Sequence, residues 1–484
     1  MEIPKEVKSI VNTLKKKDFE AYVVGGCVRD ILRGEKPKDW DVATNASPKE
    51  IEKIFPKSYY KNKFGTVTIL TNAKDESLKE VEITPYRIDE KYTDKRHPDK
   101  VLWAKTIEQD LARRDFTINA IALSDQKKFL VIDPFDGQKD LKNKVIRAVG
   151  NPEDRFSEDA LRMMRAVRFA ATLDFKVEEK TAKAIKKNSH LLQAISKERI
   201  RDEFVKIIMA DKAADGIEML RELSLLKYIL PELEEGYGIS QNKHHIYNVY
   251  EHSLLSLKFA AQKKFNLYVR IATLLHDIAK PRVKKGEGPD STFYNHEIVG
   301  AKMTCQILDS LRFSKKDIEK ITKLVRYHLF YYHPEEVGLN SVRRLVRKMG
   351  PENMEELLQV RMADRIGSGC PKAEPYKLRY LKYVIDKTSQ DPITVKTLEV
   401  SGNDVMKILN IKPGPKIGMI LDILLGYALE DPKKNKKEIL EKEIEKLNKL
   451  PEEKIKDLSN TAKKEREKIE TKQDEMTKKK YWVT

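Results

Sequence analysis

Two aspartates, Asp39 and Asp41, stand two residues apart and follow a pair of adjacent glycines, Gly25 and Gly26. Side chains alternate along a strand, so in an extended segment both carboxylates point to the same face. Neighbouring carboxylates repel each other and are tolerated when they share a divalent cation, here expected to be Mg²⁺. The glycines let backbone amides approach a phosphate closely, and Arg29 adds a fixed cation one helical turn later. Together these residues predict nucleotidyl transfer, although a hairpin with surface acids is the alternative.

The elements around these residues predict a mixed α+β chain. The segment from residue 22 to residue 41 indicates a strand, a tight turn at the glycines, a short helix and a second strand. Further strands are predicted at Val67–Leu70 and Val81–Thr84, and from about Pro152 the pattern is helical almost to the end. After about residue 433, Lys and Glu alternate with sparse Leu and Ile, which predicts one amphipathic helix followed by a partly disordered tail over 451–484.

Composition limits the class of protein. The chain has 484 residues, which is enough for three or four domains, and no apolar run is long enough to span a bilayer. Its three cysteines are far apart, so we expect no disulfide partner and no structural zinc. A formal net charge of +18 suits a polyanionic partner. We expect a cytoplasmic protein with no membrane association.

The glycine pair and the aspartate pair resemble the nucleotidyltransferase head of the polymerase-beta superfamily. More closely, the chain resembles the class II tRNA nucleotidyltransferase and bacterial poly(A) polymerase family, over roughly residues 1 to 450. The resemblance implies a nucleotidyltransferase head over 1–150, a helical neck over 151–230, an HD domain over 231–375 and a helical body and tail over 376–450. It also implies CTP, ATP and tRNA as partners, with magnesium as the cofactor of the head.

Further family motifs imply roles for residues of the head. The family's third catalytic carboxylate falls at Glu82, beside Asp39 and Asp41; the alternative is a solvent-facing strand residue. The RRDFxxNA motif spans Arg113 to Ala120 and implies that Arg114 binds the nucleotide while Asp115 and Asn119 face its sugar. Because Arg113 and Arg114 are adjacent, we expect only one of them to face the site.

The family's EDxxR motif, at Glu158 to Arg162, implies that Asp159 and Arg162 select the base. Three residues apart on one helix, they would lie on one face, where a carboxylate and a guanidinium pair with C or A. Arg165 and Arg168 would meet the triphosphate. An ordinary salt-bridged helix is the alternative. The segment 197–203 resembles the motif that braces this helix without touching substrate.

A second group of residues, separated along the chain, follows the H…HD…D pattern of the HD superfamily. Its members are His252, His276, Asp277 and Asp364, which imply one transition metal such as Mn, Ni, Fe or Co. His296 and His328 stand where some HD proteins hold a second metal. The pattern predicts the fold strongly. A scaffold role and phosphohydrolase activity on RNA ends both stay open.

Two segments bear on which family activity the chain has. Residues 86–101 resemble the flexible loop that members need to add A, and residues 61–67 resemble the "GTV" form of CCA-adding enzymes more than the basic form of poly(A) polymerases. We therefore expect addition of CCA to the 3′ end of tRNA. The alternatives are a poly(A) or A-only polymerase, an HD phosphohydrolase that acts on RNA ends, and a non-enzymatic RNA-binding scaffold.

Overall fold

The computed structural model describes residues 3–60, 65–90, 100–124, 130–242, 246–334, 336–389 and 395–483. The chain forms two compact units, Met1–Leu329 with Glu355–Ala373 and Phe330–Met354 with Glu374–Thr484. Residues 61–64 and 91–99, which carry most of the comparison between CCA addition and poly(A) synthesis, lie outside the described residues. Among the residues that are described, no helix combines the length and apolar character needed to cross a bilayer.

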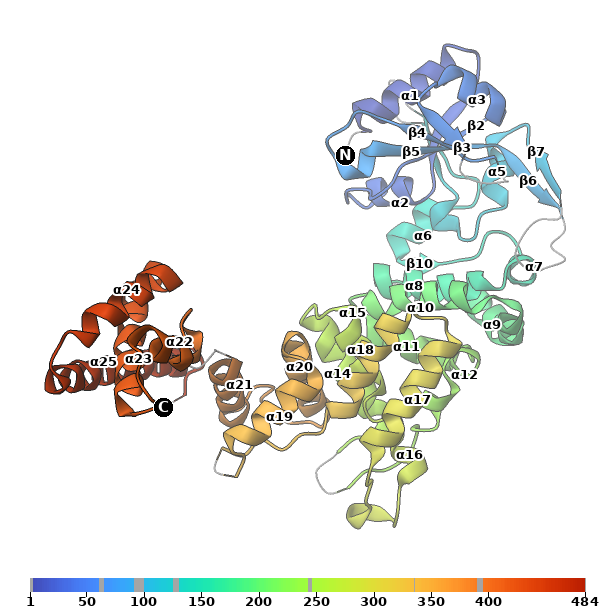
Figure 1. Ribbon diagram of the computed structural model, residues 1–484. Helices are drawn as coiled ribbons and strands as arrows, with labels where there is room; N and C mark the ends of the chain where they lie inside the picture. The colour runs from blue at the N-terminus through green and yellow to red at the C-terminus, as the bar shows by residue number, and fades with distance from the viewer. Residues whose placement is uncertain are drawn as a thin grey trace. The chain divides into compact units, whose positions relative to one another are not determined.

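The N-terminal part of the first unit is built on a seven-stranded sheet (Figure 1, blue to cyan). In order across the sheet, the strands are β3 (Ser58–Tyr60), β4 (Val67–Leu70), β5 (Glu80–Pro85), β2 (Asp41–Thr44), β1 (Ala21–Val24), β8 (Ala122–Ser124) and β9 (Leu130–Ile132). Strands β2 and β5 are parallel, and the other neighbouring pairs are antiparallel. The strands predicted at Val67–Leu70 and Val81–Thr84 are confirmed.

Short helices surround this sheet: α1 (Lys5–Lys15), α2 (Gly26–Leu32), α3 (Pro48–Ile54), α4 (Glu76–Lys79), α5 (Ile107–Ala112) and α6 (Gly137–Asn143). Helix α1 buries Val7, Ile10, Val11 and Leu14, the spacing of one apolar stripe. Two small pairings complete the region, β6 (Arg87–Glu90) with β7 (Lys100–Trp103) and β10 (Val145–Ile146) with β11 (Lys176–Val177).

From Pro152 the first unit is helical apart from β11, as predicted. Its helices are α7 (Pro152–Glu158), α8 (Leu161–Leu173), α9 (Glu179–Asn188), α10 (Lys197–Met209), α11 (Ala213–Glu222), α12 (Leu226–Ile229), α13 (Pro231–Glu234), α14 (Val249–Gln262), α15 (Leu267–Leu275), α16 (Lys280–Val283), α17 (His296–Ser310), α18 (Lys315–Tyr327) and α20 (Met354–Gly367). The α+β prediction is therefore confirmed.

One buried arginine ties these helices together. Arg270 on α15 is only 2% exposed, and its guanidinium donates to the carbonyl oxygens of Ile208 and Ala210, both at 3.0 Å, and of Phe265 at 2.8 Å. The first two carbonyls lie at the end of α10, where a helix leaves its last acceptors without intrahelical donors. Arg270 therefore fixes α15 to the end of α10.

The second unit is helical, with α19 (Leu339–Met349), α21 (Tyr376–Ser389), α22 (Gly402–Leu409), α23 (Pro415–Glu430), α24 (Lys437–Asn448) and α25 (Glu452–Lys480). Its core is aliphatic and draws on α22 to α25 through residues such as Val405, Ile420, Leu424, Ile444 and Ile455.

The expectation of disorder after residue 451 is wrong for Glu452–Lys480, which form the single helix α25. The cause is tertiary contact that the Lys- and Glu-rich composition does not reveal. Asp474 pairs with Lys387 at 2.6 Å and accepts a hydrogen bond from Tyr383, while Lys480 pairs with Asp386 at 2.8 Å. These contacts tether α25 to α21 along the C-terminal part of its length.

Candidate functional site

The first unit contains a cavity of about 660 Å³ that collects charged side chains from the sheet and from α8 and α10. It is lined by Val24, Gly25, Gly26, Arg29, Asp39, Asp41, Thr66, Thr84, Arg87, Arg113, Arg114, Asp115, Asn119, Asp159, Leu161, Arg162, Arg165, Arg168, Phe169 and Arg199. Every predicted catalytic and nucleotide-binding residue except Glu82 is in this set. Eight arginines face four aspartates here, so the cavity suits a polyanion that also brings or shares cations.

The Gly-Gly turn forms one wall of the cavity. Gly25 has φ +81° and ψ −140°, and α2 begins at Gly26 directly after it. A Cβ atom at Gly25 would lie 2.9 Å from Nη1 of Arg114 and 3.2 Å from Oδ2 of Asp41. The turn thus requires glycine both for its backbone conformation and for the close approach of these two side chains.

The two aspartates line the cavity, but not for the reason that strand alternation suggested. Strand β2 begins at Asp41, and Asp39 precedes it in a bend. Glu82 on β5 lies in register with Asp41 on the neighbouring parallel strand. It is nevertheless absent from the described residues that line the cavity. Asp39 and Asp41 therefore line the cavity where the chain enters β2. Glu82 lies beside Asp41 on the neighbouring strand.

Asp115 and Asn119 belong to a chain of hydrogen bonds across the cavity wall. Arg29 donates to the side chain of Asn119 at 3.0 Å, Asn119 donates to Asp115 at 3.1 Å, and Nε of Arg165 donates to Asp115 at 2.7 Å. Burial alone would raise the pKa of Asp115, but Arg165 and Asn119 outweigh it and hold the pKa at about 2. The pair predicted to face the sugar is therefore joined, and it links α2 to α8.

Arg113 and Arg114 both face the cavity, so the expectation that only one does is wrong. The reason is that α5 ends at Ala112, which places both arginines beyond the helix, where its geometry no longer separates them. Arg113 and Arg114 both pair with Asp110, at 2.7 and 3.2 Å.

The predicted base-selecting pair is not on one continuous helix. Asp159 is an extended residue between α7 and α8, and its carboxylate accepts the backbone N–H of Leu161 at 3.1 Å. Aspartate favours such breaks because its side chain competes with the helix for backbone donors. Asp159 and Arg162 still both line the cavity.

Each member of that pair has a different partner. Arg199 on α10 holds both carboxylate oxygens of Asp159, at 2.7 and 3.3 Å, while Arg162 pairs with Glu158 at 2.6 Å. Arg199 itself lines the cavity, a position that its place in the bracing motif did not suggest. Glu203 from the same motif does brace α8, because it pairs with Arg168 at 3.2 Å.

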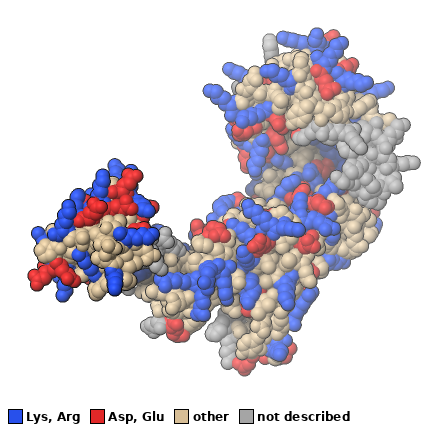
Figure 2. Space-filling view, in the orientation of Figure 1, with Lys and Arg blue, Asp and Glu red and all other residues tan. Residues whose placement is uncertain are grey.

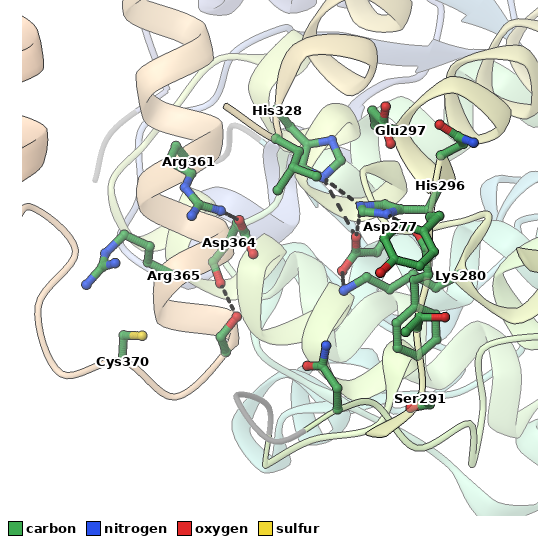
Figure 3. A pocket seen from close by; sticks show the side chains of 17 residues that line it. Asp277, Lys280, Ser291, His296, Glu297, His328, Arg361, Asp364, Arg365 and Cys370 are labelled. Carbon is green, nitrogen blue, oxygen red and sulfur yellow. Dashed lines mark hydrogen bonds and ion pairs between the residues drawn. The ribbon is translucent and has the colours of Figure 1, made fainter. Parts of the chain in front are cut away.

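The HD residues form a second site in the same unit, next to a cavity of about 700 Å³ (Figure 3). Side chains with metal-ligating atoms fall into two groups that share one residue. The groups are His252, His276 and Asp277, and Asp277, His296 and His328. Asp364, on the facing helix α20, lies 3.4 Å from Nε2 of His252 and also pairs with Arg361. The structure thus brings together all six residues that the sequence singled out.

Ring orientation at this site is set by the backbone. In three rings, Nδ1 lies 2.7 to 2.8 Å from a carbonyl oxygen three residues earlier, His276 with Thr273, His296 with Phe293 and His328 with Val325. A proton on Nδ1 leaves Nε2 with a lone pair directed inward.

The inward nitrogens meet at short range. Nε2 of His252 and Nε2 of His276 are 2.8 Å apart, and those of His296 and His328 are 3.4 Å apart. With Nδ1 protonated, the lone pairs of His296 and His328 face each other, an arrangement that a cation between them stabilises. The donor set of imidazoles around a shared carboxylate therefore fits a divalent transition metal.

Family models match most of the first unit. The Poly A polymerase head domain matches residues 21–147, the probable RNA and SrmB-binding site of polymerase A matches 174–236, and the HD domain matches 249–367. By residue number, the first match covers the sheet region of Figure 1, and the other two cover mainly the helices that follow it.

Curated relatives match nearly the whole chain. The CCA-adding enzyme of Ligilactobacillus salivarius is 36% identical and is covered over 99% of its length by 94% of this chain. That of Lactococcus lactis is 32% identical, with 91% of this chain and 97% of the relative covered. A crystal structure of the Bacillus stearothermophilus CCA-adding enzyme in complex with CTP matches with a TM-score of 0.59 and 27% identity, covering 93% of this chain and 98% of that one. These matches confirm the family resemblance inferred from the motifs, and the chain belongs to the family of class II CCA-adding enzymes.

Proposed function

We propose that the head cavity of this enzyme adds C, C and A to the 3′ end of tRNA, from CTP and ATP and without a nucleic acid template. The observation that carries the proposal is the lining of one cavity. The carboxylate pair, the Gly-Gly turn and the two residues of the EDxxR motif all face the same space of about 660 Å³. That space therefore combines groups for transfer with groups that can discriminate a base.

Asp39 and Asp41 supply oxygen ligands suited to magnesium, with Glu82 beside Asp41 in register on the next strand. When bound, magnesium neutralises charge on the triphosphate and makes the attacking 3′-hydroxyl more acidic. The amides of the Gly-Gly turn and the guanidinium of Arg114 lie on the same wall and orient the phosphates.

Arg165 and Arg168 on α8 extend the cationic wall, while the joined Asp115 and Asn119 offer acceptors and a donor for the ribose hydroxyls. Asp159 accepts from the exocyclic amine that C and A share, and Arg162 donates to the ring nitrogen or carbonyl oxygen. U and G lack an amine at that position, so the pair rejects them.

The decisive experiment offers tRNA lacking its 3′ end together with CTP, ATP or both, and sizes and sequences the products. Three added nucleotides support CCA synthesis, long tails support a poly(A) polymerase, and one A without C supports an A-only enzyme. Asp39→Asn should abolish all transfer. Asp174→Asn is the matched control, because Asp174 lies outside the cavity with φ +57°, a conformation that Asn also favours.

A second activity is proposed for the HD site, on the strength of its inward-facing nitrogens. His252, His276, Asp277 and Asp364 would hold a divalent transition metal such as Mn, Ni, Fe or Co, and His296 and His328 with Asp277 would hold a second. Such metals act as Lewis acids toward phosphate oxygens. Lys280, 2.7 Å from Asp277, and Arg361 place two cations at the cavity where a phosphate at an RNA end would bind (Figure 3).

Metal content and hydrolysis test this second proposal separately from the first. Purified protein should carry about one or two equivalents of transition metal by elemental analysis, and His276→Ala should lose them. The same variant should stop hydrolysing a 3′ or cyclic phosphate at an RNA end, yet still extend tRNA. Asp39→Asn should show the reverse pattern. Equal metal content in His276→Ala and the wild type would contradict the metal assignment.

A further inference from the structure

Helix α19 of the second unit presents arginine side chains along one exposed face. Asn340, Arg343, Arg344 and Arg347, which recur at intervals of three and four residues, border a hollow of about 540 Å³. The opposite face is apolar and packed, with Val342 only 3% exposed. Figure 2 shows Lys and Arg side chains gathered over this helix. The helix is thus anchored by its apolar side and displays its cations to solvent.

The charge on this face is not compensated. Helix α19 contains no Asp or Glu, and within the described part of the chain no carboxylate forms an ion pair with Arg343, Arg344 or Arg347. Each of the other α-helices of this unit, α21 to α25, contains at least one Asp or Glu. Helix α19 therefore differs from them in carrying three arginines on one face with no acidic residue of its own.

Uncompensated like charges on one helix face repel each other. Arg343 and Arg347 are four residues apart and Arg344 and Arg347 are three apart, the spacings at which helical neighbours interact. A ligand with several negative charges would relieve this repulsion at more than one point. Lysine outnumbers arginine in the chain, yet arginine predominates here, and its planar fork binds phosphate oxygens in pairs.

We propose that Arg343, Arg344 and Arg347 bind the phosphate backbone of tRNA during catalysis. The inference rests on the proposed function, which supplies tRNA as the substrate. Backbone phosphates recur along an RNA strand and are recognised by charge and shape without reading bases. An anionic membrane fits less well, because a helix that lies in a bilayer surface needs an apolar face for the lipid, and the apolar side of α19 is packed in the protein.

The test replaces all three arginines by Gln and measures tRNA binding and turnover. Because Asn340 and the apolar face stay in place, the fold should be retained, which a thermal melt checks. We expect KM for tRNA and the Kd from filter binding to rise at least about tenfold at physiological salt, with KM for CTP and ATP unchanged. The slope of log Kd against log salt should fall by roughly 2 to 3, at about 0.9 per lost phosphate contact.

The matched control removes the same charge from another exposed helix of the second unit. Lys464, Lys468 and Lys472 lie on α25 among acidic residues, and changing all three to Gln should leave tRNA binding within about threefold of the wild type. Equal losses in both triple variants would overturn the proposal, because net charge alone would then explain them. So would an unchanged Kd and salt slope in the α19 variant. A variant that loses binding to phosphatidylserine vesicles while tRNA binding stays intact would also overturn it.

Failure of this inference is distinguishable from failure of the proposed function. If the wild type does not extend tRNA, the function is wrong, whatever the α19 variant binds. If the wild type extends tRNA and the variant matches it in KM, only the role of α19 is wrong.

Discussion

Replacing Gly25 by Ala should damage the active site through the backbone. Its φ of +81° and ψ of −140° lie where residues other than glycine are strained by about 1–3 kcal/mol. Lower entropy of the unfolded chain offsets about 0.4–1 kcal/mol of this. We therefore expect the free energy of unfolding to fall by about 1–2 kcal/mol. The new Cβ would also stand 2.9 Å from Arg114 and 3.2 Å from Asp41, so kcat/KM should fall by about 100-fold.

Two neighbouring glycines separate strain from crowding. Gly34 has φ +76°, and a Cβ added there would have no atom within 4 Å, so Gly34→Ala should lose about 1–2 kcal/mol of stability and keep its activity. At Gly26, the first residue of α2, the nearest atom to an added Cβ would lie at 3.6 Å, so alanine should not destabilise. Urea unfolding and incorporation of CTP and ATP into tRNA measure both effects. If Gly25→Ala matches the wild type in stability and activity, the geometric reasoning is refuted.

Three further changes test other parts of the first unit. Arg199→Gln should release Asp159 and raise misincorporation of U and G more than it lowers total incorporation, and unchanged selectivity on sequencing the products would contradict this. Arg270→Met should lower the free energy of unfolding by about 2 kcal/mol or more, because buried carbonyls lose their donor; a loss below about 0.5 kcal/mol in urea would argue against the clamp. Asp115, with its pKa lowered to about 2 despite burial, should stabilise the fold fully above its unfolded pKa near 3.8, and the effect should fade as pH falls toward 2. Asp115→Asn should therefore show a flatter dependence of stability on pH between about 4 and 2 than the wild type, and parallel profiles would contradict the ion pair with Arg165.

Local sequence was sufficient for the elements that form the Gly-Gly wall of the head cavity. A strand, two glycines and a short helix follow one another without long-range help, so β1, the turn at Gly25 and α2 were predictable from residue types. The HD site was predictable too, because imidazole and carboxylate donors are chemically distinctive even when far apart in sequence. The helical pattern that begins at about Pro152 was sufficient to divide the mixed region from the helical region.

Helix ends and contacts between distant segments account for what was missed. The break at Asp159 comes with a local hydrogen bond from the backbone of Leu161 and an ion pair with Arg199, forty residues later, and helical spacing in the EDxxR segment marks neither contact. Arg113 reaches the cavity only because α5 ends one residue earlier. Helix α25 pairs with α21 through Asp474. From composition alone, Asp474 is expected to be one more solvated charge. Helical periodicity marks neither the residue at which a helix ends nor its partner in a distant segment.

The path of the chain limits how this enzyme can be cut or synthesised. Asp364 is encoded between two stretches that belong to the other unit, Phe330–Met354 and Glu374–Thr484. A stop codon placed after residue 329 would remove the second unit and one carboxylate of the HD site together, whereas one placed after 373 would leave α19 without α21. No single truncation separates the units. During translation, the HD site stays incomplete until after α19, the first helix of the other unit, has been synthesised.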